Sequence, residues 1–131
     1  TSCHLFLHAI QLLEIKGLVD PADRVFERAT WAFREAFFTQ LANISERNVQ
    51  FEIAEELRLP IAAIQAQMDS GEAYAQLSKD FDLVKEHTVT VSPTLIFNEG
   101  RQRLNGNVGY RVMESNIREL LQNPPDEQSW C

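Results

Sequence analysis

The residues best suited to redox chemistry are the two cysteines, Cys3 and Cys131, which stand near opposite ends of the 131-residue chain. Thiol–disulfide exchange requires a reactive thiolate, commonly made by a Cys-x-x-Cys pair at the start of a helix. Phe6 occupies the position where such a partner of Cys3 would stand. We therefore expect two unpaired thiols and no catalytic residue in this chain. Whether the two cysteines pair stays open, because sequence spacing cannot place two sulfur atoms.

A metal site is the second kind of chemistry that the sequence suggests. His4 and His8 are four residues apart, so a helix would place both imidazoles on one face, as in many zinc sites. The segment "HLFLH" lacks the glutamate of a metalloprotease helix and supplies no third ligand. An ordinary polar helix face is the better interpretation. His87 ends a predicted helix, where a cation favours the dipole, and has no catalytic role. We expect neither a metal ion nor a cofactor.

The charge of the chain excludes two classes of partner. Lysine and arginine number 12 against 19 aspartates and glutamates, for a net charge of −7. Nucleic acid or an anionic membrane surface would need a basic face, so we expect neither as a partner. The sequence has no apolar stretch long enough to span a membrane and no evident signal peptide. Because it begins at Thr1 without a methionine, we expect a missing native N-terminus, which leaves the compartment open between the cytoplasm, which we favour, the periplasm and secretion.

The first two thirds of the chain carry the apolar periodicity of amphipathic helices. Gly17 is a predicted stop for the first helix, and Asp20-Pro21 is a predicted start for the second. The expected helices cover residues 3–17, 21–43, 45–59, 60–71 and 72–87. The second contains an aromatic set, which packing into a core explains better than a ligand groove does: Trp31, Phe33, Phe37 and Phe38.

After His87 the apolar period changes from helical to extended. The β-branched and aromatic run 89–98 predicts a strand, Asn98–Gly100 predicts a tight turn, and 101–106 predicts a second, shorter strand. A final helix should follow over 110–122, with five apolar residues facing inward: Val112, Met113, Ile117, Leu120 and Leu121. Interleaved glutamates make the arginines of this region a solvated mixed surface: Arg101, Arg103, Arg111 and Arg118. The expected fold class is α+β, mostly α, with a flexible tail at 123–131.

Pro93 lies inside the apolar run of the first strand, where a missing N–H should weaken pairing. Around it, "EELRLPIAAIQAQMDSGEAYAQLSKDFDLVKEHTVTVSPTLIFN" and above all "SPTLIFNEGRQRLNGN" resemble the DsbA-like thiol–disulfide oxidoreductases. The resemblance implies that residues 1–88 are the helical insertion of such a domain. It implies that 89–122 are the C-terminal half of its thioredoxin fold, strand–turn–strand–helix.

The resemblance also assigns a substrate-binding loop. It implies a cis peptide bond before Pro93, a backbone at Ser92 that faces an extended peptide substrate, and a following strand that begins at Thr94. The β-α-β unit that carries the family's Cys-x-x-Cys pair has no counterpart in this sequence. We therefore expect a truncated domain, inactive alone, whose parent exchanges disulfides with thiol-containing proteins or peptides.

Two alternatives stay open. One is a fragment of a glutathione-dependent isomerase or transferase of the same fold, in which a lone serine replaces the Cys-x-x-Cys pair. The other is a non-catalytic helical interaction domain. The resemblance also suggests a partner, because "TLIFN", residues 94–98, is apolar and uncharged and lacks the strand that the resemblance would place beside it. We expect this edge to pair with the same edge of a second copy in a homodimer.

Overall fold

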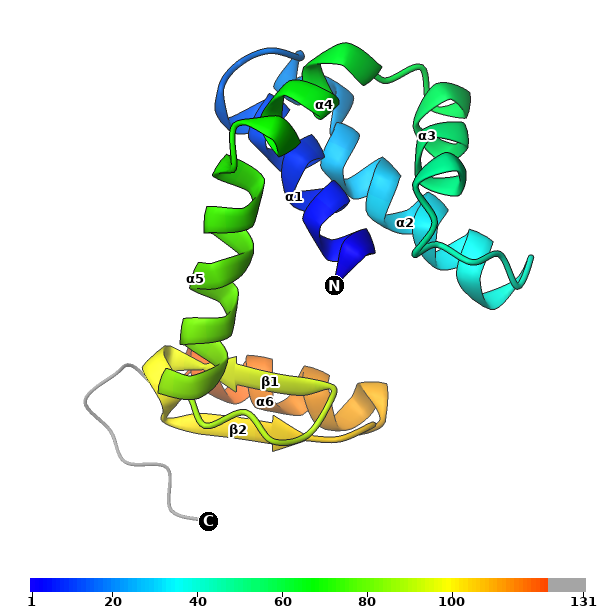
Figure 1. Cartoon of the computed structure of the whole chain (residues 1–131). Helices are drawn as coiled ribbons and strands as arrows, with labels where there is room; N and C mark the ends of the chain where they lie inside the picture. Colours follow the sequence, from blue (N-terminus) through cyan, green and yellow to red (C-terminus); the bar gives the residue numbers. More distant parts are fainter. Residues whose placement is uncertain (123–131) are drawn as a thin grey trace. The chain divides into compact units, whose positions relative to one another are not determined.

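The computed structural model describes residues 1–122, apart from the side chain of Glu99, so the predicted tail at 123–131 and Cys131 lie outside the described residues. The described part is mostly helical α+β, with six α-helices and one two-stranded antiparallel hairpin, as the sequence predicted. Figure 1 follows the elements along the chain. The elements are α1 (Ser2–Ile15), α2 (Val25–Phe38), α3 (Arg47–Glu56), α4 (Ile61–Asp69), α5 (Glu72–Glu86), β1 (Thr94–Phe97), β2 (Gln102–Asn105) and α6 (Tyr110–Gln122), with short 3-10 turns at Pro21–Asp23 and Asn98–Gly100.

The chain divides into two compact units, Thr1–Phe81 and a second that begins at Asp82. We call them the helical unit and the hairpin unit. The boundary between the two units falls inside α5.

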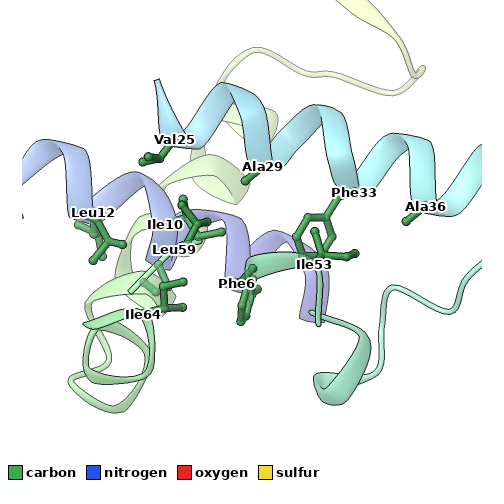
Figure 2. Packing of buried hydrophobic residues seen from close by; sticks show 14 residues of the cluster. Phe6, Ile10, Leu12, Val25, Ala29, Phe33, Ala36, Ile53, Leu59 and Ile64 are labelled. Carbon is green, nitrogen blue, oxygen red and sulfur yellow. The ribbon is translucent and has the colours of Figure 1, made fainter. Parts of the chain in front are cut away.

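The helical unit has a closed apolar core. Helix α1 packs against both α2 and α4, and α3 packs against α2 and α4. Phe6, Ile10, Phe33 and Ile64 are almost fully buried, and Figure 2 shows them converging from three helices. The rings of Phe6 and Phe33 lie 5.8 Å apart, a separation at which tilted aromatic pairs attract. This core positions α2 and leaves its far side to solvent.

The ends of α1 and α2 show how local residues set the helices. After α1, Gly17 adopts a φ of +65°, and Leu18 N donates to Leu13 O over 2.8 Å, which completes the predicted glycine stop. The predicted start at Asp20-Pro21 instead forms a separate 3-10 turn, in which Asp20 accepts from Ala22 N. Arg24 then has a φ of +46°, so α2 begins only at Val25.

The aromatic set of α2 is the main error in the expected core. Phe33 is buried, but Trp31, Phe37 and Phe38 are exposed by 68%, 49% and 75%. The inward stripe of α2 is filled by Val25, Ala29, Phe33 and Ala36, and the other three aromatic residues fall outside that stripe. Phe37 and Phe38 instead contact each other edge to face, with ring centres 4.9 Å apart.

In the hairpin unit, none of the residues from 82 to 122 whose side chains are described is buried. Strand β1 pairs antiparallel with β2, so that Leu95 lies opposite Leu104 and Ile96 opposite Arg103. The predicted turn is confirmed as the 3-10 turn Asn98–Gly100. In α6 only Met113 and Leu120 of the residues expected inside are half-buried, whereas Val112, Ile117 and Leu121 are exposed. A sheet of two short strands is too narrow to cover the whole apolar stripe of that helix.

Candidate protein-binding loop

The loop that the resemblance marked lies directly before β1. Ser92 and Pro93 are exposed and Thr94 is half-buried. The Ser92–Pro93 peptide bond is cis, as expected. The proline is tolerated because β1 begins only at Thr94, one residue later, so no regular ladder position loses a donor.

Hydrogen bonds on both sides fix this loop. Gly106 N donates to Pro93 O over 2.8 Å, which ties the loop to the end of β2. The Thr94 hydroxyl donates to Val91 O over 2.5 Å and lies 3.4 Å from Asn105 Oδ1. Gly106 has a φ of +79°, a conformation that glycine adopts at little cost. The loop is therefore braced from behind while the Ser92–Pro93 segment faces solvent.

The approach to the loop is held by Arg103, whose role the sequence did not reveal. Helix α5 ends at Glu86, and two residues later Thr88 adopts a left-handed conformation, with Val89 N donating to Val84 O over 2.9 Å. The Arg103 guanidinium donates to Thr88 O over 3.2 Å and also to His87 O. A cation suits the carbonyls at a helix C-terminus.

The cysteine within the described residues shows no sign of activation. Cys3 is half-buried and packs against the core of the helical unit. Burial raises the pKa of its thiol above the ordinary value of 9.0, while the N-terminal ammonium lowers the pKa to a smaller extent. A reactive cysteine needs the opposite shift, because the thiolate is the nucleophile.

The two N-terminal histidines do not converge on a common site. His8 Nε2 lies 2.8 Å from Asp80 Oδ2 and its Nδ1 lies 3.2 Å from Gln11 Oε1, whereas His4 is exposed. Residues 1–122 contain no group of three or more histidine, cysteine, aspartate or glutamate side chains that could hold a metal ion. Within the same range, every helix is too short or too polar to cross a membrane.

A hollow of about 720 Å³ lies on the outer side of α2, which the sequence did not predict. Trp31, Phe26 and Leu57 supply apolar lining, and Arg28, which also lines the hollow, donates to Leu57 O over 3.3 Å. The available signal was that Trp31 falls outside the inward stripe of α2. Core packing therefore explains Phe33 but not Trp31.

No protein-family model matches this chain. The chain is distantly similar to the ClpXP adapter protein SpxH of Bacillus subtilis (strain 168), a DsbA/thioredoxin-like protein. Identity is 32% over 98 residues. The aligned region is 70% of this chain and 32% of SpxH, so the chain spans about a third of the length of the curated relative that it matches.

This similarity supports the coarser part of the resemblance, a distant relation to DsbA/thioredoxin-like proteins. Chemically, the described residues offer an exposed, braced backbone loop and no activated nucleophile. Such an arrangement can hold an extended segment of another protein by main-chain hydrogen bonds.

Proposed function

We propose that this chain is the client-holding part of an adapter that brings another protein to a ClpXP-type protease. The observation that carries the proposal is the similarity to a ClpXP adapter protein over 70% of the chain. An adapter must bind its client without converting it, so it needs a recognition surface and no reactive group. The raised pKa of the Cys3 thiol agrees with that requirement.

We assign the recognition role to Ser92, Pro93 and Thr94. Ser92 and Pro93 are exposed, and the bonds made by Gly106 and by the Thr94 hydroxyl hold the backbone in place before a client arrives. A segment that is already ordered loses little conformational entropy on binding, which favours affinity. The client in this proposal is an extended, uncharged protein segment, because residues 88–98 carry no charged side chain.

Site-specific photo-crosslinking tests the assignment. A photoreactive amino acid at Ser92 should capture a client from a lysate of cells that lack ClpX, whereas the same probe at the exposed Ser115 of α6 should not. The captured protein is then identified and offered to purified ClpXP. We expect degradation to accelerate when the complete protein that contains this chain is added. Equal capture at both positions would remove the loop assignment, and an unchanged degradation rate would remove the adapter function.

A second candidate is the thiol–disulfide oxidoreductase that the sequence suggested. The sequence "SPTLIFNEGRQRLNGN" favours it, because that is the segment most like the DsbA family. In this case the reactive cysteine pair belongs to a part of the protein outside these 131 residues. Insulin reduction by the complete protein, lost when a Cys-x-x-Cys pair is changed to serine, would favour this function. A lone serine at that position would point to the glutathione-dependent branch, while the β1–β2 pair already disfavours a purely helical interaction domain.

A further inference from the structure

The outer face of α2 is the side turned away from the apolar core. The inward stripe consists of Val25, Ala29, Phe33 and Ala36, and Figure 2 shows these side chains on the side of α2 that meets the other helices. With about 3.6 residues per turn, Trp31 falls on the opposite side of the helix. Its indole is exposed, so a large apolar surface is available for burial by a partner.

Charged side chains surround this indole. Residues three and four apart are neighbours on a helix surface. Glu27 and Arg28 therefore precede Trp31 on the same face, and Arg34 and Glu35 follow it. All five residues line the hollow of about 720 Å³ beside α2. Apolar and charged groups thus meet on one surface.

The arginines of this surface outnumber the carboxylates that stay unpaired. The Glu27 carboxylate forms an ion pair with the Arg24 guanidinium. Arg34 is exposed and makes no hydrogen bond or ion pair with a described residue. Arg28 donates only to a main-chain carbonyl, which leaves its positive charge without a carboxylate. Against these two arginines stands one carboxylate without an ion pair, that of Glu35.

This surface is basic in a chain that is acidic. The whole sequence has a net charge of −7, yet from Arg24 to Phe38 three arginines stand against two glutamates. In α3, α4 and α5, by contrast, acidic side chains outnumber basic ones. An acidic partner segment therefore meets less repulsion at α2 than at those three helices.

The lining of the hollow indicates what kind of partner fits it. Eight of its nine lining residues belong to α2 and the other is Leu57, all within the helical unit. A surface built mainly on one helix has no opposite wall, so it cannot enclose a small molecule as typical ligand pockets do. A protein segment brings a second wall of its own. Tryptophan and arginine are also the side chains that most often carry binding energy at protein interfaces.

We propose that this face of α2 is a docking site for an acidic segment of a partner protein that carries a bulky apolar side chain. The apolar side chain enters the hollow against Trp31, Phe26 and Leu57. Carboxylates beside it meet Arg28 and Arg34. Burial of the indole supplies most of the affinity, while the two arginines select acidic partners. This inference is independent of the adapter function.

Peptides of defined sequence test the proposal. The probes are capped pentapeptides of the form Glu-Glu-X-Glu-Glu, in which X is leucine, isoleucine, methionine or phenylalanine. Added to the ¹⁵N-labelled chain, at least one of them should shift the indole N–H signal of Trp31 in the NMR spectrum and leave the amide signal of Ser115 in α6 unchanged. The series with lysine in place of glutamate, and the acidic peptide with serine at X, should shift neither signal. No response of Trp31 to any acidic peptide, or an equal response to the lysine series, would overturn the proposal.

Substitutions at exposed positions separate the apolar and charged parts of the site. Trp31→Ala should weaken binding at least about tenfold, because it removes the main apolar contact. Arg34→Gln should weaken it about threefold, and added salt should reduce this difference. Arg111→Gln is the matched control on α6 and should leave the affinity unchanged. The NMR titration measures all three variants, and equal weakening by Arg34→Gln and Arg111→Gln would contradict the proposed contact.

The complete protein that contains this chain decides whether the site is available there. The acidic peptide of highest affinity is titrated into the complete protein by isothermal titration calorimetry, and we expect an affinity similar to that of the chain. Absence of binding would show that another part of the protein occupies this face, which would overturn the proposal. A dimer of the unchanged chain that Trp31→Ala abolishes would assign the face to a second copy and would overturn it likewise.

Discussion

The helical unit and the hairpin unit both contain amphipathic helices, but only the helical unit encloses a buried apolar core among the described residues. In the helical unit, α1 is covered by α2 and α4, and residues such as Phe6 and Ile10 are completely buried. In the hairpin unit, α6 is a strongly amphipathic helix, yet none of its residues is buried. An apolar stripe becomes a core only where a second surface matches it in width.

The difference also separates two kinds of surface. The helical unit carries its exposed aromatics on the outer side of a helix whose inner side is already packed, as Trp31 and Phe33 show. In the hairpin unit, no second strand of the described residues lies along the outer edge of β1. The first surface can stay bare without an unmade hydrogen bond, whereas the second leaves main-chain donors and acceptors that need water or a strand.

The largest expected effect compares one phenylalanine from each unit. Phe6→Ala should lower the free energy of unfolding by about 3–5 kcal/mol, because Phe6 is fully buried against the Phe33 and Phe51 rings. Phe97→Ala, at a half-buried position of β1, should cost about 1 kcal/mol. Urea unfolding followed by circular dichroism measures both. Equal losses would show that the hairpin unit is as well packed as the helical unit.

The next effect concerns the contact that fixes the lead-in to β1. Arg103→Ala should lower stability by about 1 kcal/mol, because it removes donors to His87 O and Thr88 O. Hydrogen exchange should show the loss in the hairpin unit and unchanged protection in α1. Arg111→Ala is the control, since that exposed guanidinium forms no ion pair within residues 1–122. Faster exchange in α1 after Arg103→Ala would contradict a local role.

A smaller effect should appear at Cys3 as the pH changes. The folded chain holds the thiol proton more tightly than the unfolded chain, because burial raises the pKa of Cys3 above 9.0. The stability that this contributes is present below pH 9.0 and is lost as the pH rises through the raised pKa. In a Cys131→Ser variant, iodoacetamide should therefore modify the folded chain more slowly than the urea-unfolded chain at neutral pH. The same rate in both states would rule out the protection.

The last prediction is that the chain alone does not catalyse disulfide reduction. The chain alone should not accelerate insulin reduction by dithiothreitol beyond a Cys3→Ser/Cys131→Ser variant. The sequence has no Cys-x-x-Cys pair, the arrangement that commonly supplies the activated thiols for exchange. Cysteine-dependent acceleration would mean that a single thiol of this chain can be activated.

Local features of the fold were predictable because single residues determine them. Gly17 ends α1, and Asn98–Gly100 turns the hairpin, as their sequences indicated. The start of α2 was not predictable, because the left-handed conformation of Arg24 belongs to a residue type that rarely adopts it. Apolar periodicity likewise located the stripe of α6 but could not show whether any surface covers Ile117.

Part of the candidate site was also within reach of the sequence. The order of Ser92, Pro93 and Thr94 marked the loop and predicted the cis bond through the family resemblance. Their role in binding stays a prediction, as does the division of the chain into an insertion and a thioredoxin-fold half. Arg103 was missed because its partners are backbone carbonyls, which have no signature in the sequence.

Trp31 gives this molecule an optical property that follows from its place on α2. An indole exposed by 68% emits at the longer wavelengths typical of a hydrated fluorophore and is open to collisional quenchers. Its emission therefore changes little when the core around Phe6 melts, because the indole is already in water. The same fluorophore brightens or shifts to the blue when something fills the hollow beside α2. In a Trp130→Phe variant, which leaves Trp31 as the one tryptophan of the sequence, fluorescence thus reports occupancy of a surface more faithfully than it reports unfolding.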